Sequence, residues 1–115
     1  MKPFKYRNPF IKSEELSIIL NRLIKTYNPR TVFLFGSYVW GSPGPNGDID
    51  FLVLLDKADA SQPERIRRGL RALRGIAIPV DILVLTTQEI DTHKDHPSTL
   101  IYKVLRKGIK LYDAA

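Results

Sequence analysis

Three aspartates and one glycine–serine pair are the residues of this sequence whose types and spacing suggest chemistry. Gly36-Ser37 is followed by ten residues and then by Asp48-Ile49-Asp50, and Asp81 lies thirty-one residues after Asp50. Carboxylates close to one another repel unless a cation lies between them, and Mg²⁺ prefers such hard oxygen ligands. A Gly-Ser turn at the end of a strand exposes backbone N–H groups that bind phosphate. The spacing therefore indicates a site that holds a metal–nucleotide.

The first two aspartates open an apolar run over residues 48–55. Side chains alternate between the two faces of a strand, so Asp48 and Asp50 point to one face and Ile49 points into the core. The plainer alternative is that Asp48 closes a turn after Gly47 and that Asp50 lies on a solvent-facing edge.

The third aspartate, Asp81, lies inside another apolar run, over residues 78–85. A carboxylate in such a strand needs a partner or a metal, although a hydrogen bond to neighbouring backbone would also satisfy it. If this strand lies beside the 48–55 strand, three carboxylates on two strands form a two-metal site for in-line displacement at phosphorus.

Hydrophobic periodicity predicts a small mixed β-sheet flanked by helices, in the α/β (α+β) class. The strands are apolar runs without polar alternation, which is typical of strands buried on both faces. A loop is required at residues 42–47, which contain two prolines and two glycines. The predicted strands lie at 31–35, 48–55, 78–85 and 109–112, with a helix at 13–27 before them, a helical turn through Trp40 and a short helical turn within 86–95. A further helix runs from Pro63 to Gly75, with Ile66, Leu70 and Leu73 in the core. The last helix runs from Pro97 to Gly108, with Leu100, Ile101, Val104 and Leu105 in the core.

The composition predicts one soluble domain over residues 1–115, with residues 1–12 as an extended arm. Hydrophobic residues make up 43% and charged residues 26% of the chain, which is usual for a soluble globular domain. The absence of cysteine excludes disulfides and cysteine-bound zinc, and it fits a cytoplasmic location. No apolar run is long enough to span a bilayer, and the basic N-terminus lacks the apolar segment of a signal peptide.

The net charge of +6 is concentrated in residues 64–74, which contain five arginines and one glutamate. This excess indicates an anionic partner, which is either nucleotide phosphate, nucleic acid or an acidic protein surface. The alternative is an ordinary solvated helix face. His93 and His96 are expected to be solvent-exposed or capping residues and not metal ligands.

The motifs together resemble those of the minimal nucleotidyltransferases of the DNA polymerase β superfamily. The resemblance rests on residues 35–41 (Phe-Gly-Ser-Tyr-Val-Trp-Gly), 48–53 (Asp-Ile-Asp-Phe-Leu-Val), 80–82 (Val-Asp-Ile) and the tail at 104–112. It covers most of Thr31 to Tyr112 and implies the polymerase β-like nucleotidyltransferase fold.

The resemblance also implies roles for the five residues. Asp48 and Asp50 would bridge two Mg²⁺ ions, and Asp81 would bind the catalytic ion and help to activate the attacking hydroxyl. Gly36 and Ser37 would hold the β- and γ-phosphates of a nucleoside triphosphate, with ATP as the expected substrate. The hydroxyl would attack the α-phosphate, and pyrophosphate would leave.

This chain departs from the family pattern between the two motifs. Many members carry basic residues after the Gly-Ser pair, where this chain has Tyr38 and Trp40. Their commonest loop ending before the Asp-x-Asp motif is Asp-Ser, where this chain has Asn46-Gly47. The departures affect the loop contacts to phosphate or acceptor and leave the three acids unchanged.

Minimal members of this superfamily resemble the antitoxin half of two-gene toxin–antitoxin systems. The other half is an all-helical HEPN ribonuclease, and the transferase adds AMP to a tyrosine of that toxin and silences it. The resemblance thus implies a protein partner, with Tyr38, Trp40 and the arginine-rich helix as candidate contacts. Three alternatives stay open: an enzyme with a small-molecule acceptor, a non-catalytic module that neutralises its partner by contact, and a nucleic-acid binder. The last lacks a supporting aromatic RNA-binding motif, so nucleic acid is not the expected substrate.

Overall fold

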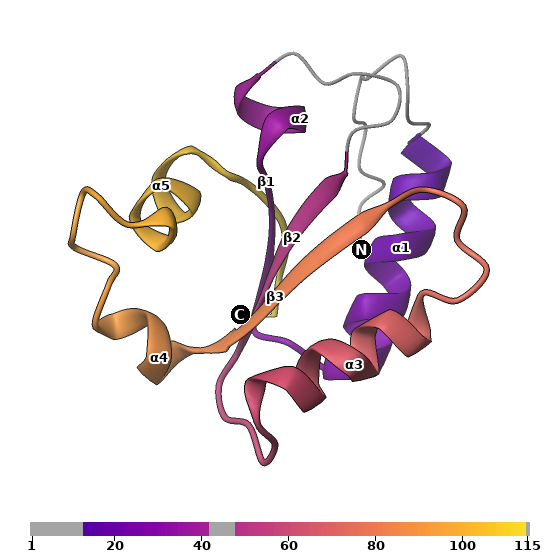
Figure 1. Cartoon of the computed structure of the whole chain (residues 1–115), viewed down its shortest axis with the longest axis horizontal. Helices are drawn as coiled ribbons and strands as arrows, with labels where there is room; N and C mark the ends of the chain where they lie inside the picture. Colours follow the sequence, from indigo (N-terminus) through magenta and orange to yellow (C-terminus); the bar gives the residue numbers. More distant parts are fainter. Residues whose placement is uncertain (1–12, 42–47, 115) are drawn as a thin grey trace.

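A four-stranded mixed sheet with helices on both faces forms the fold of the protein, as the computed structural model shows (Figure 1). The structure describes residues 13–41 and 48–114, so the predicted arm at 1–12 and the predicted loop at 42–47 lie outside the described residues. The elements are α1 (Ser13–Tyr27), β1 (Thr31–Phe35), α2 (Ser37–Trp40), β2 (Ile49–Leu55), α3 (Gln62–Ala72), β3 (Val80–Thr86), α4 (Thr87–Asp91), α5 (Leu100–Lys107) and β4 (Ile109–Asp113).

The strand order is β3-β2-β1-β4. β1 is antiparallel to both β2 and β4, whereas β2 and β3 are parallel and are joined by the crossover that contains α3. All five residues of β1 are buried, and in β2 only Asp50 is not. The predicted mixed sheet is therefore confirmed, and its two central strands are buried on both faces.

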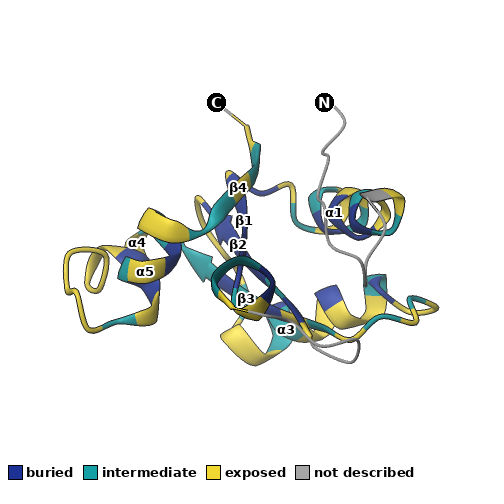
Figure 2. Ribbon diagram, turned by 90° about the horizontal axis from the view of Figure 1, so that it is seen from above, coloured by how far each residue is buried: buried dark blue, intermediate teal, exposed yellow. Residues whose placement is uncertain are grey.

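The sheet separates two apolar cores (Figure 2). α1 and α3 cover one face, where Ile49 and Phe51 of β2 are fully buried. α4 and α5 cover the other face, where Leu52 packs in one cluster with Val104 of α5. Alternation along β2 therefore directs Ile49 toward α1, as predicted, and directs Asp50 toward the α5 side.

α3 contacts the rest of the core through a glycine. A Cβ atom on Gly69 would lie 2.3 Å from both Ile82 Cδ1 and Tyr27 Oη, so only glycine lets this helix pack so closely on β3 and α1. This orientation leaves Leu70 50% exposed, so its predicted place in the core is wrong. The apolar pattern predicted Leu70 in the core because Gly69, the residue that packs on the sheet, is not a large apolar residue and adds nothing to that pattern.

α5 begins later than predicted. Thr99 caps it by accepting a hydrogen bond from the Tyr102 backbone N–H, so Pro97 precedes the helix instead of opening it. Leu100 is consequently the first helical residue, and it is 47% exposed, so its predicted burial is also wrong. None of the helices described between residues 13 and 114 is long and apolar enough to cross a membrane.

The buried Arg65 and the partly exposed Glu89 form an ion pair that joins α3 to α4. The guanidinium donates from Nη1 to Glu89 Oε1 at 2.7 Å and from Nη2 to Glu89 Oε2 at 3.1 Å. It also donates to the carbonyl oxygens of Val84 and Ala60, at 2.9 Å each, so the buried charge is well satisfied. Glu89 completes a capping box with Thr86. Hydrogen bonding to Arg65 lowers the pKa of Glu89 to about 2.

This pair leads to a prediction about stability and pH. Glu89→Gln should lower the free energy of unfolding at neutral pH by about 2 kcal/mol, because it leaves the buried Arg65 charge without its partner. The folded-state pKa of Glu89 is depressed from 4.5 to about 2, so its stabilisation is present above pH 4.5 and disappears as the pH falls toward 2. Urea unfolding of both proteins across this range measures the difference.

The matched control is Asp56→Asn, which removes an exposed ion pair with Arg30. That substitution should change the unfolding free energy by less than about 0.5 kcal/mol at any pH. A Glu89→Gln effect as small as the control, or one that persists near pH 2, would show that the Arg65–Glu89 pair does not stabilise the fold.

Candidate active site

The strand register brings two of the three predicted acids together. Asp50 of β2 is directly opposite Asp81 of β3 in the parallel ladder. Neighbouring strands are about 4.8 Å apart, and residues in register on adjacent strands point to the same face. Both carboxylates therefore lie side by side on the face that α5 covers.

Asp48 joins this pair from the residue that precedes β2. The Ile49 N–H donates to the Pro79 carbonyl at 3.0 Å, which holds the start of β2 against the start of β3. Asp48 lies outside the ladder and is exposed. A hydrogen bond between the Asp48 and Asp81 side chains raises the pKa of Asp81, so these two carboxyl groups are neighbours. The three acids thus form one anionic group at the N-terminal ends of two parallel strands.

The acids disfavour one another's charged forms. Burial raises the pKa of Asp50, and the charges of Asp81 and then Asp48 raise it further. The pKa of Asp81 is raised by the hydrogen bond with Asp48, by burial and by the charge of Asp48. A bound cation would remove this repulsion.

Gly36 lies directly against this acidic group. A Cβ atom at this position would be 1.9 Å from Asp50 Oδ2 and 2.9 Å from its Cγ, and the backbone has φ = 84°. Glycine is therefore required twice, for the positive φ and for the close approach of the backbone. α2 starts at the next residue, Ser37, so the Gly-Ser turn and the acids are adjacent, as the motif predicts.

An apolar pocket adjoins the acids. It has a volume of about 360 Å³ and is lined by Phe35, Asp50, Asp81, Ile82, Leu83 and Leu100. Its lining thus combines two carboxylates with aliphatic and aromatic side chains, so a ligand there would meet both charged and apolar groups.

The acids have the chemistry of a metal site without a closed arrangement around an ion. Within residues 13–41 and 48–114, no group of three or more His, Cys, Asp or Glu side chains is placed so that it could already hold a metal ion. The donor types nevertheless suit Mg²⁺, and their mutual repulsion favours a cation. The strand register already brings Asp50 and Asp81 directly opposite each other.

The family model described as "Polymerase beta, Nucleotidyltransferase" matches residues 18–115, which is most of the chain. The chain belongs to the polymerase β nucleotidyltransferase family. Nucleotidyltransferase domains of this family generally use a nucleoside triphosphate and a divalent metal. No curated protein matches this chain.

The nucleotidyltransferase fold is also found in a solved structure. The crystal structure at 1.40 Å resolution of a candidate nucleotidyltransferase from Sulfolobus solfataricus superposes with a TM-score of 0.61. The match covers 88% of this chain and 79% of that one, at 20% sequence identity. At this identity the similarity supports the polymerase β-like fold and says nothing about substrate.

The other predicted contact residues lie in different places. Tyr38 is buried, and Trp40 packs on Phe35 and donates from Nε1 to the Lys107 carbonyl at 3.1 Å, so it joins α2 to α5. The arginine-rich helix α3 lies on the opposite face of the sheet from the acids (Figure 2). His93 and His96 are exposed, as predicted.

Sequence reasoning did not single out Lys103 and Lys107 of α5, which lie on the acids' side of the sheet. Their spacing of four residues on one helix was the available signal.

Gly36→Ala tests the contact with Asp50. We expect it to destabilise the protein by about 3 kcal/mol, because the new methyl group meets a carboxylate and the positive φ is strained. Gly75→Ala is the matched control, since Gly75 has φ = 88° but a Cβ atom there would meet nothing within 4 Å. The control should cost only about 1 kcal/mol. Equal losses in urea unfolding would contradict the proposed close contact.

Asp50→Asn and Asp81→Asn test the repulsion. Without divalent metal, each should raise the unfolding free energy by up to about 1 kcal/mol near neutral pH. Because both pKa values are raised, this gain should vanish at acid pH, where the carboxylates of the wild type are protonated. Adding Mg²⁺ should raise the melting temperature of the wild type more than that of either variant.

Asp59→Asn serves as control for these variants, because Asp59 is an exposed aspartate paired with Arg68 away from the acids. It should respond to Mg²⁺ as the wild type does. An identical Mg²⁺ response in all four proteins would argue against metal binding by these acids.

Proposed function

We propose that this nucleotidyltransferase transfers AMP from ATP to a hydroxyl group of a protein partner, a tyrosine of an all-helical HEPN-type toxin, and so acts as its antitoxin. The observation that carries the transferase activity is the register of Asp50 opposite Asp81, with Asp48 in contact with Asp81. The family match supports the nucleotide substrate, and the resemblance to HEPN-linked minimal nucleotidyltransferases supports the partner.

Asp48, Asp50 and Asp81 would hold two Mg²⁺ ions in this proposal. When bound, these ions would neutralise the charge that develops on the transferred phosphate. Gly36 and Ser37 would hold the β- and γ-phosphates with backbone N–H groups and the serine hydroxyl.

Asp81 would act on the acceptor. Its carboxylate would accept the proton of the attacking hydroxyl while the hydroxyl oxygen bonds to the α-phosphorus and the bond to pyrophosphate breaks. A raised pKa suits this task, since a stronger base accepts the proton more readily. Asp81 lies on the edge strand β3 and is exposed, so a side chain of another protein can reach it from solvent.

A second candidate function is neutralisation of the partner by contact alone. It is favoured by one observation: in the part of the chain that the structure describes, the acids are not yet arranged to hold a metal ion. In this case the acids would be dispensable for silencing the partner. A small-molecule acceptor is the third outcome that an experiment has to distinguish.

Transfer of label from ATP tests the proposal. The protein is incubated with Mg²⁺ and ATP labelled at the α-phosphate, with and without an all-helical HEPN-type protein. We expect label on that protein, and a loss of at least about a hundredfold in Asp50→Asn and Asp81→Asn. Asp59→Asn is the control with unchanged labelling.

The alternatives give other results. Tight binding without label, together with neutralisation of the partner by Asp50→Asn, would support the contact mechanism. Label on added small molecules, with the partner protein unlabelled, would support a small-molecule acceptor.

A further inference from the structure

The acids and the arginine-rich helix lie on opposite sides of the sheet. Asp50 and Asp81 point to the face that α5 covers, whereas α3 packs with α1 on the other face. A macromolecule whose hydroxyl reaches the exposed Asp81 at the β3 edge therefore has α5 as the neighbouring helix on that face of the sheet. The apolar side of α3 packs in the core of that other face, so most of its length is separated from the acids by the sheet.

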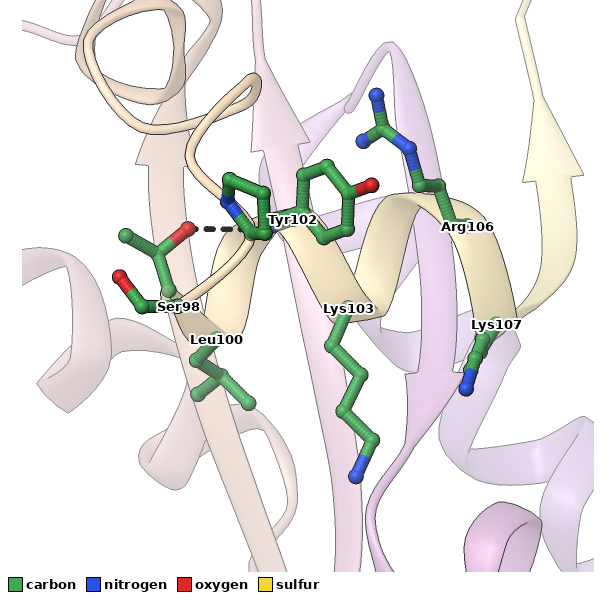
Figure 3. A pocket seen from close by; sticks show the side chains of 8 residues that line it. Ser98, Leu100, Tyr102, Lys103, Arg106 and Lys107 are labelled. Atoms are coloured by element: carbon green, nitrogen blue, oxygen red, sulfur yellow. Dashed lines mark hydrogen bonds between the residues drawn. The ribbon is translucent and has the colours of Figure 1, made fainter.

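A groove lies along α5 (Figure 3). It has a volume of about 510 Å³, and its lining includes Ser98, Leu100, Tyr102, Lys103, Arg106 and Lys107. Leu100 also lines the pocket at Asp50 and Asp81, so the groove and the acids adjoin. A ligand in the groove that contacts Leu100 therefore lies next to the pocket that Asp50 and Asp81 line.

Two lysines of this groove are available to an anion. Lys103 and Lys107 extend to the same side of α5, away from Arg106 (Figure 3), and neither forms an ion pair with any described residue. On α3 the situation is the reverse, because its four arginines are already paired with carboxylates. Arg65 pairs with Glu89, Arg67 and Arg71 pair with Glu64, and Arg68 pairs with Glu64 and Asp59.

The groove favours an acidic peptide over a single-stranded nucleic acid. Single-stranded nucleic acid binds by stacking its bases on aromatic faces, and a cation occupies one face of each of two rings near this groove. The Arg106 guanidinium lies 3.7 Å from the centre of the Tyr102 ring, and Lys103 Nζ lies 4.1 Å from that of Trp40. Leu100 is 47% exposed and offers an aliphatic contact of the kind that suits a protein side chain.

We infer that the α5 groove, with Lys103 and Lys107 as its anion-binding residues and Leu100 as its apolar contact, docks an acidic segment of the acceptor protein beside Asp50 and Asp81. This inference rests on the proposed function, because it assigns that function's acceptor to a surface. The arginine-rich helix takes no part in acceptor docking.

The test separates binding from transfer. The probe is a fluorescein-labelled random copolymer of glutamate and tyrosine, which is acidic and carries acceptor hydroxyls, and fluorescence anisotropy measures its affinity. We expect Lys103→Glu/Lys107→Glu to weaken binding at least about tenfold. The single variant Lys107→Glu, which leaves the Lys103–Trp40 contact intact, should weaken binding by about threefold.

Arg67→Glu/Arg74→Glu, on α3 and just after its end, is the matched control with the same change of net charge. It should bind the copolymer within about twofold of the wild type. Asp50→Asn should also still bind the copolymer while losing label transfer, so failure of catalysis is distinguishable from failure of docking. Circular dichroism melting confirms that each variant is folded.

Three results would overturn the inference. One is unchanged binding by the folded Lys103→Glu/Lys107→Glu variant. Another is an equal loss in the α3 control, which would indicate attraction by net charge alone. The last is displacement of the labelled copolymer by oligothymidylate of equal charge at a lower concentration than unlabelled copolymer requires. That result would identify the groove as a nucleic-acid surface.

Discussion

The parallel pairing of β2 with β3 is the constraint on which the rest of the site depends. It sets Asp50 opposite Asp81, whereas the antiparallel neighbour β1 sets Phe35 opposite Asp50. A parallel pair needs a long crossover, and here the crossover contains α3, whose Gly69 contacts Ile82, the residue after Asp81. A helix on the far face of the sheet thus helps to hold the register of the acids.

The two ends of β3 have opposite energetic roles. At its start, like charges at Asp81 and Asp50 repel, which opposes folding in the absence of a cation. At its end, Glu89 follows the strand and is paired with the buried Arg65, which stabilises the same strand. A small domain can tolerate a repulsive site because a strong, well-satisfied pair lies at the opposite end of the strand that carries it.

Much of the fold and the grouping of the acids could be predicted from the sequence, because strands and motifs have strong local patterns. Thr31–Phe35 and the positions of Asp48, Asp50 and Asp81 on strand starts follow from apolar runs and the period of two. The contact of Gly36 with Asp50 could not be predicted, since it depends on how two strands pair. The exposure of Leu70 and Leu100 could not be predicted either, because it depends on the rotation of each helix, which Gly69 and the Thr99 cap determine. The cluster of arginines on α3 is visible in the sequence, whereas the face of the sheet that each helix covers is not. The structure was therefore needed to show that α5, and not α3, lies on the same face as the acids.

The hydrogen bond from Arg65 to Val84 also bears on the exposed edge of the sheet. β3 is an edge strand, and edge strands can pair with strands of other molecules and start aggregation. Arg65 occupies the Val84 carbonyl near one end of that edge, and the charged Asp81 lies near the other. A strand that approaches the edge would have to displace the guanidinium and bring its own backbone next to a cluster of negative charge. A charge at Asp81 therefore disfavours strand addition at this edge, besides its place in the candidate site.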